Sequence, residues 1–192
     1  MLTNPNITKD ISSVIANAVG GASTRPAAIV GAVVPTTQVQ TIGTLSATPM
    51  MSTAGGLLDR VIFEVTTGGA AGSKGRVGIY DSISPSDITP DALVVDGGEF
   101  DTTLAQVNRA VVSVNLKPNT LYWLVSLFGT AAPTCRGAAL SSCSGVIGLG
   151  STMTTSRQVI NASQTYGALP ATWPGSSTFA ATGTAIIWTR YV

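Results

Sequence analysis

LKPNTLYWLVSLFG, residues 116–129, is the stretch that decides the fold expected for this chain of 192 residues. Pro118 presets the backbone of a tight turn, and Asn119 tolerates the position that follows it. From Leu121 to Phe128 nearly every residue is apolar, at odd and even positions alike. A strand that is apolar on both faces is typical of a central strand covered on both sides. The stretch therefore predicts a hairpin at the centre of a β-sandwich.

Alternation of apolar residues predicts further strands before and after this stretch. One face is apolar at every second residue in DRVIFEV (59–65), in RVGIY (76–80) and in NRAVVSVNL (108–116). ALVVDGG and EFDTTL predict two short strands around Gly97-Gly98, and short strands are also expected in GVIGLG, RQVIN and TAIIWTRYV. Short strands separated by turn signals are typical of an all-β fold, an antiparallel β-sandwich or jelly roll.

The N-terminal part of the chain has a different pattern. Residues 1–22 predict one short amphipathic helix, whose apolar face needs a partner. The residues on that face follow three- and four-residue steps: Ile7, Ile11, Val14 and Ile15. Residues 23–56 are small, Thr-rich and interrupted by Pro, which indicates an extended arm with one or two strands. We therefore expect residues 1–56 to be a docking or oligomerisation arm and residues 57–192 to be the β-sandwich domain.

The chain is unusually poor in charge. Charged residues make up 10%, the formal net charge is +1, and apolar residues make up 44%, which excludes a disordered protein. A surface with so few charges stays soluble with difficulty in isolation. This favours burial of the surface by sister subunits over an isolated domain covered with hydroxyl groups. The basic residues are scattered, so no nucleic-acid groove is expected.

Membrane insertion and signal-directed secretion are not expected either. No apolar run reaches the ~18 residues of a membrane helix. The longest candidate, PAAIVGAVVP (26–35), is short and bracketed by prolines. The N-terminus, MLTNPNITKDISS, lacks the charged start and apolar block of a secretory signal. We therefore expect the chain to be made in the cytoplasm.

The side chains that carry most enzyme chemistry are missing. The chain contains no histidine, which excludes Ser-His-Asp triads, Cys-His pairs and most zinc sites. Asp96, Glu99 and Asp101 in DGGEFD could form a carboxylate pair or a calcium site. Aspartates beside a Gly-Gly pair more commonly cap turns, and we interpret them so. We expect no catalytic residue, no metal site, no cofactor and no enzymatic activity.

Two cysteines and three aromatic residues leave alternatives open. Cys135 and Cys143 are eight positions apart, so they could close a small disulfide loop or remain reduced thiols. Tyr166, Trp173 and Trp188 lie in or near YGALPATWPG and the terminal strand. Such aromatic side chains either pack in the core or an interface, or contact a ligand such as a sugar.

The order of these motifs resembles that of a known family. LLDRVIFEVTTGGAAGSKGRVGIYDS is followed by LVVDGGEFDTT, VSVNLKPNTLYWLVSLFG, YGALPATW and a closing strand that ends in TRYV. This order over residues 57–192 is similar to a β-sandwich module of tailed-bacteriophage virion proteins, found especially at the C-terminal ends of tail fibres. Asn119 stands where the family often has Gly, and Trp173 where it usually has Phe.

The resemblance implies a virion structural protein that is made in the host cytoplasm, has no enzymatic activity and commonly forms a homotrimer. We expect a short tail fibre or spike-type appendage. Its arm would contact other virion proteins of the tail or capsid, and its sandwich would face outward, towards host surface glycans. A capsid decoration (cement) protein that stabilises the head is the first alternative. A stand-alone carbohydrate-binding module is the second.

Overall fold

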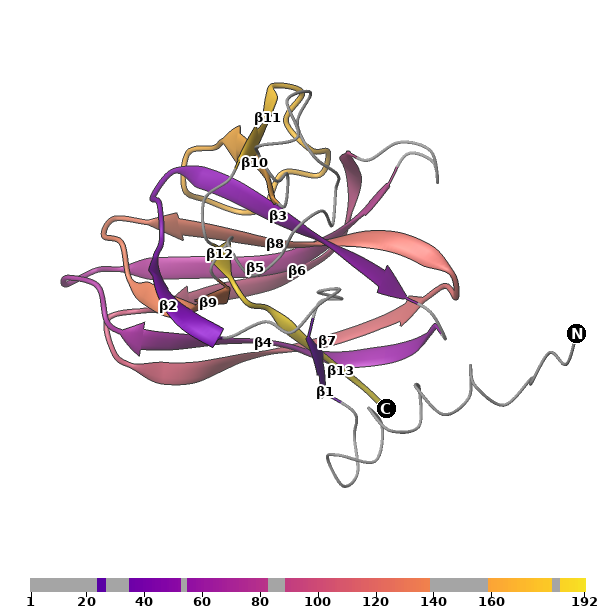
Figure 1. Ribbon diagram of the computed structural model, residues 1–192, viewed down its shortest axis with the longest axis horizontal. Helices are drawn as coiled ribbons and strands as arrows, with labels where there is room; N and C mark the ends of the chain where they lie inside the picture. The colour runs from indigo at the N-terminus through magenta and orange to yellow at the C-terminus, as the bar shows by residue number, and fades with distance from the viewer. Residues whose placement is uncertain (1–23, 27–34, 53–54, 83–88, 139–158, 181–183) are drawn as a thin grey trace, which may run out of the picture.

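A computed structural model of the chain describes residues 24–26, 35–52, 55–82, 89–138, 159–180 and 184–192. The described residues form two antiparallel sheets that pack face to face (Figure 1). The all-β, antiparallel sandwich expected from the alternation of apolar residues is confirmed. The amphipathic helix expected from Ile7, Ile11, Val14 and Ile15 lies outside the described residues.

The described strands divide between the two sheets as follows. Sheet A contains β1 (Thr24–Pro26), β2 (Pro35–Val39), β4 (Gly56–Thr67), β7 (Gln106–Leu116), β9 (Thr134–Ala138), β12 (Thr184–Ala185) and β13 (Trp188–Tyr191). Sheet B contains β3 (Thr44–Ser52), β5 (Lys74–Ser82), β6 (Pro90–Asp101), β8 (Thr120–Gly129), β10 (Val159–Ser163) and β11 (Ser177–Ala180). In sheet A, β4 pairs with β7 on one side and with β13 and β9 on the other. Sheet B has the order β11-β10-β3-β8-β5-β6.

The hairpin expected between β7 and β8 is wrong. β8 lies between β3 and β5 in sheet B, with its side chains from Tyr122 to Phe128 buried, so its central position is confirmed. β7 instead pairs with β4 of sheet A, and residues 117–119 carry the chain from one sheet to the other. Asn119 has a φ of 52°, and the Lys117 N–H donates to Tyr122 Oη at 3.0 Å. β7 is buried on one face only, which suits a sheet with one exposed face. β8 is buried on both faces, which suits a central strand covered on both sides.

Two hydrophobic cores hold the layers together. The first fills the space between the sheets, where the Phe63 ring packs edge-on against Phe100 and Phe128, with centroids 5.4 and 6.1 Å apart. The second lies on the outer face of sheet B and contains Trp123 and Tyr80, which the segment 164–176 covers. β8 is apolar at both odd and even positions because each of its faces contributes to one of these cores.

The boundary between arm and sandwich differs from the one expected at residue 57. β3 lies between β10 and β8, and its Leu45 and Ala47 are fully buried in the second core. β1 and β2 also pair with strands of sheet A. The strand signal of TLSATPMMS is weak because Thr, Ser, Ala and Pro predominate in it. Pro49 is tolerated beyond the end of β10, whose pairing with β3 covers residues 44–47.

The two short strands expected around Gly97-Gly98 form one continuous strand, β6. Gly98 has a φ of 88°, a conformation that favours glycine, and the pairing of β6 with β5 shifts register between Arg76 and Gly78. The glycine pair therefore makes a bulge within the strand instead of a turn between two strands.

Candidate functional site

The three aromatic residues singled out in the sequence lie in different places. Trp173 is only 8% exposed, its Nε1–H donates to Ser177 Oγ at 2.7 Å, and its ring packs edge-on against Tyr80. Tyr166 is half-buried and lies so close to Gly129 that a Cβ on this glycine would meet the ring at 2.3 Å. Trp188 is half-buried on the outer face of sheet A. The structure therefore puts Trp173 in the core and brings no pair of these residues together as a platform.

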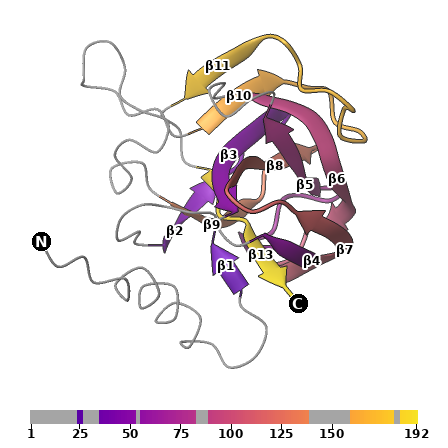
Figure 2. The same cartoon turned by 90° about the vertical axis from the view of Figure 1, so that its right-hand side faces the viewer.

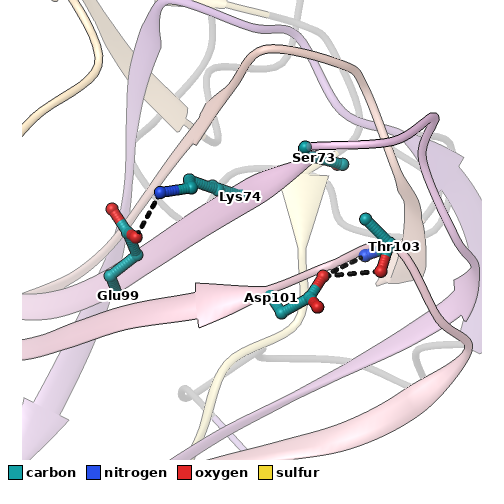
Figure 3. Close-up of a pocket in the computed structure, with 6 residues that line it drawn as sticks. Ser73, Lys74, Glu99, Asp101 and Thr103 are labelled. Carbon is teal, nitrogen blue, oxygen red and sulfur yellow. Dashed lines mark hydrogen bonds and ion pairs between the residues drawn. The ribbon is translucent and has the colours of Figure 1, made fainter.

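A polar depression of about 220 Å³ lies where β5 begins and β6 ends (Figure 3). Lys74 Nζ donates to Glu99 Oε1 at 2.7 Å, and the Asp101 carboxylate accepts bonds from the N–H and the hydroxyl of Thr103 at 2.8 and 2.7 Å. Tyr166 Oη donates to the other oxygen of Glu99 at 3.3 Å. The residues that line the depression are Gly72, Ser73, Lys74, Glu99, Asp101 and Thr103.

These contacts keep the two exposed carboxylates of the depression ionised. The hydrogen bond from Lys74 is the main cause that lowers the pKa of Glu99, and the hydrogen bonds from Thr103 lower that of Asp101. A carboxyl that acts as a general acid near neutral pH needs a raised pKa instead. Glu99 and Asp101 are thus hydrogen-bond acceptors that could hold polar groups but are not prepared to donate a proton.

Asp96 supports the local structure. Its carboxylate accepts bonds from the Gly98 N–H at 2.8 Å and from Arg76 Nη1 at 2.9 Å, and it also accepts the Leu169 N–H at 3.2 Å. The turn-capping role predicted for the aspartates of DGGEFD is seen in Asp101, whereas Asp96 binds the backbone of the bulge within β6. The part of the chain that the structure describes contains no group of three or more His, Cys, Asp or Glu residues placed to hold a metal ion. The same part contains no helix long and apolar enough to span a membrane.

The accessibility of the Cys135 thiol can be tested by labelling with a thiol reagent. Cys135 is buried between the sheets, and burial raises the pKa of its thiol to about 12. The thiol is therefore protonated and unreactive at neutral pH. In a Cys143→Ser variant, we expect a thiol reagent to label the unfolded chain but not the folded one. Rapid labelling of the folded variant would show that Cys135 is accessible.

The disulfide predicted as one of two alternatives stays a prediction, because Cys143 lies outside the described residues. The labelling experiment separates the alternatives when it is repeated on the unchanged chain, unfolded without reductant. Reduced cysteines would take up label at both positions, whereas a bridge would leave both unlabelled.

Comparison with models of protein families, with characterised proteins and with solved structures found no match to this chain. What the chain does must therefore be argued from its own residues, its fold and the resemblance of its motifs.

Proposed function

We propose that this chain is a structural subunit of a bacteriophage virion that assembles with copies of itself into a short tail fibre or spike-type appendage. The class of protein comes from the resemblance of its motifs. The feature of the molecule that supports assembly best is the edge strand β7. It is eleven residues long, it pairs only with β4 among the described strands, and it contains one charged residue, Arg109.

Sheet edges in isolated proteins are usually blunted by charges, by proline or by short strands, because an open edge invites pairing with another chain. β7 is long, contains no proline and has only one charge, and Val107 and Val111 on its outward face are 43% and 75% exposed. Leu104, just before the strand, is 66% exposed. These exposed apolar side chains on and beside an edge strand are best explained by burial in an assembly.

In the proposed assembly, the sandwich faces outward as a rigid body and the N-terminal residues dock it to the particle. The apolar set Ile7, Ile11, Val14 and Ile15 would supply the docking contact, as its sequence pattern predicts. The sandwich suits a purely structural role, because its two hydrophobic cores and its buried aromatic contacts hold the two sheets and the covering segment together.

The mass of the native protein in solution tests this proposal. We expect the full chain to form a closed oligomer, a trimer by analogy with the resembling family, and a chain lacking residues 1–22 to lose its attachment to the particle. A full chain that remains a single, freely soluble copy at high concentration would contradict the proposal. Labelled copies found at capsid three-fold positions of an intact particle would favour the capsid decoration protein over the tail appendage.

A further inference from the structure

The outer face of sheet A gathers arginine and apolar side chains from strands far apart in the sequence. The strand register places Arg109 of β7, Ile62 of β4 and Trp188 of β13 side by side in one row. The neighbouring row brings together Val111, Arg60 and Arg190. We call these six residues the basic face: Arg60, Ile62, Arg109, Val111, Trp188 and Arg190.

The charges on this side of the sheet do not cancel. The Asp59 carboxylate pairs with Arg190 and lies 3.5 Å from Arg60 Nη1, and the Glu64 carboxylate accepts two bonds from Arg136 at 3.0 and 3.1 Å. Arg109 forms no ion pair with the described residues, and it is exposed. Among the described residues, the outer side of this sheet therefore carries more positive than negative charge. It has four arginines, Arg60, Arg109, Arg136 and Arg190, and two carboxylates, Asp59 and Glu64.

An acidic surface lies next to the basic face, on the edge of the other sheet. β6 is the edge strand of sheet B and contains four carboxylates and no basic residue, and we call these residues the acidic edge: Asp91, Asp96, Glu99 and Asp101. Arg76 and Lys74 of β5 pair with Asp96 and Glu99. Asp91 and Asp101 have no ion pair with the described residues.

β6 and β7 lie side by side along one flank of the sandwich (Figure 2). A Cβ on Gly97 of β6 would come within 2.8 Å of the Ala110 Cβ of β7, so the two edges approach closely. The basic face and the acidic edge therefore adjoin along β7 and are not on opposite ends of the molecule.

We propose that the basic face of one copy packs against the acidic edge of the next copy, in a head-to-tail contact. This inference deepens the proposed function and rests on it, because it names the surfaces through which the copies assemble. The complementary charges would orient the two copies, and Trp188 with its neighbouring arginines has the composition of an interface centre. A head-to-tail contact of this kind generates a closed ring when the rotations between neighbouring copies add up to a full turn.

Two variants of the full chain, each damaged on one surface, test the contact. The first carries Arg109→Glu and Val111→Asp on the basic face. The second carries Glu99→Lys and Asp101→Asn on the acidic edge, where Asn keeps an oxygen for the Thr103 N–H. Each variant alone should have the mass of a single copy at concentrations where the unchanged chain is an oligomer. An equimolar mixture should form a complex of two copies that does not grow, because each variant retains one intact surface.

The matched control is Met51→Asp, which places a charge at an exposed apolar residue of β3, three strands away from β6. This variant should assemble as the unchanged chain does, and all variants should keep the thermal transition of a folded chain. Raising the salt concentration from about 0.05 to 0.5 M should also weaken the assembly, since salt screens charges at a surface.

The outcomes separate the two proposals. A single-copy unchanged chain overturns the proposed function and this contact together. An oligomeric unchanged chain with oligomeric variants leaves the proposed function intact and overturns the contact. Single-copy variants that do not combine in the mixture also overturn it, because only a head-to-tail contact is restored by mixing.

Discussion

Trp123→Ala should lower the free energy of unfolding by about 3–5 kcal/mol, the usual cost of deleting a large buried aromatic side chain. Trp123 is fully buried in the second core, and its Nε1–H donates to Ser82 Oγ at 2.7 Å. The substitution leaves a cavity between sheet B and the segment 164–176. A loss of that size is much of the roughly 5–15 kcal/mol that stabilises a typical domain. Chemical denaturation followed by circular dichroism measures it.

Trp123→Phe is the control for this prediction. Phenylalanine retains most of the aromatic packing and gives up the hydrogen bond to Ser82, so the loss should be clearly smaller than that of the alanine variant. An alanine variant with the denaturation midpoint of the unchanged chain would show that the outer face of sheet B is not a packed core.

Gly68→Ala should destabilise the sandwich by about 3 kcal/mol, at the upper end of the usual cost of overpacking. A Cβ at Gly68 would lie 1.9 Å from the Thr103 carbonyl oxygen and 2.4 Å from its carbon. Backbone atoms cannot turn aside as the end of a flexible side chain can. The connection after β4 would therefore have to move away from the connection between β6 and β7, which the Gly69 N–H holds by a bond to Thr102 O at 3.0 Å.

Gly167→Ala serves as the matched control, because an added Cβ there meets no atom within 4 Å. We expect its stability to be unchanged or raised by up to about 1 kcal/mol, through the smaller entropy of the unfolded chain. Equal thermal midpoints for the two alanine variants would contradict the close approach of the two connections.

The sequence predicted the sandwich because burial on one or two faces leaves a direct record in the alternation of apolar residues. The inward positions of Val61, Phe63 and Ala110 follow that alternation, as does the two-sided burial of β8. β3 was missed as a sandwich strand because the small residues that pack most tightly are not hydrophobic enough to signal a strand. Ala47 is fully buried yet resembles an arm residue in the sequence.

The candidate surfaces were only partly visible in the sequence. The outward direction of Arg109 follows from the alternation in NRAVVSVNL, but its neighbours Ile62 and Trp188 come from strands far along the chain. For Trp173 the sequence left core packing and ligand contact open, and the structure shows core packing against Tyr80. A single sequence reports which way a side chain points relative to its own strand, and it does not report what covers that side.

The sequence by itself determined the class of fold, the turn at Pro118-Asn119 and the central place of the strand that follows it. These depend on local backbone preferences and on the apolar pattern of each strand, which are properties of neighbouring residues. Only the tertiary structure decided that β7 and β8 belong to different sheets, and that β6 and β7 meet along one flank. Those choices depend on which strands pair across long stretches of chain, where the free energy comes from the packing of whole layers.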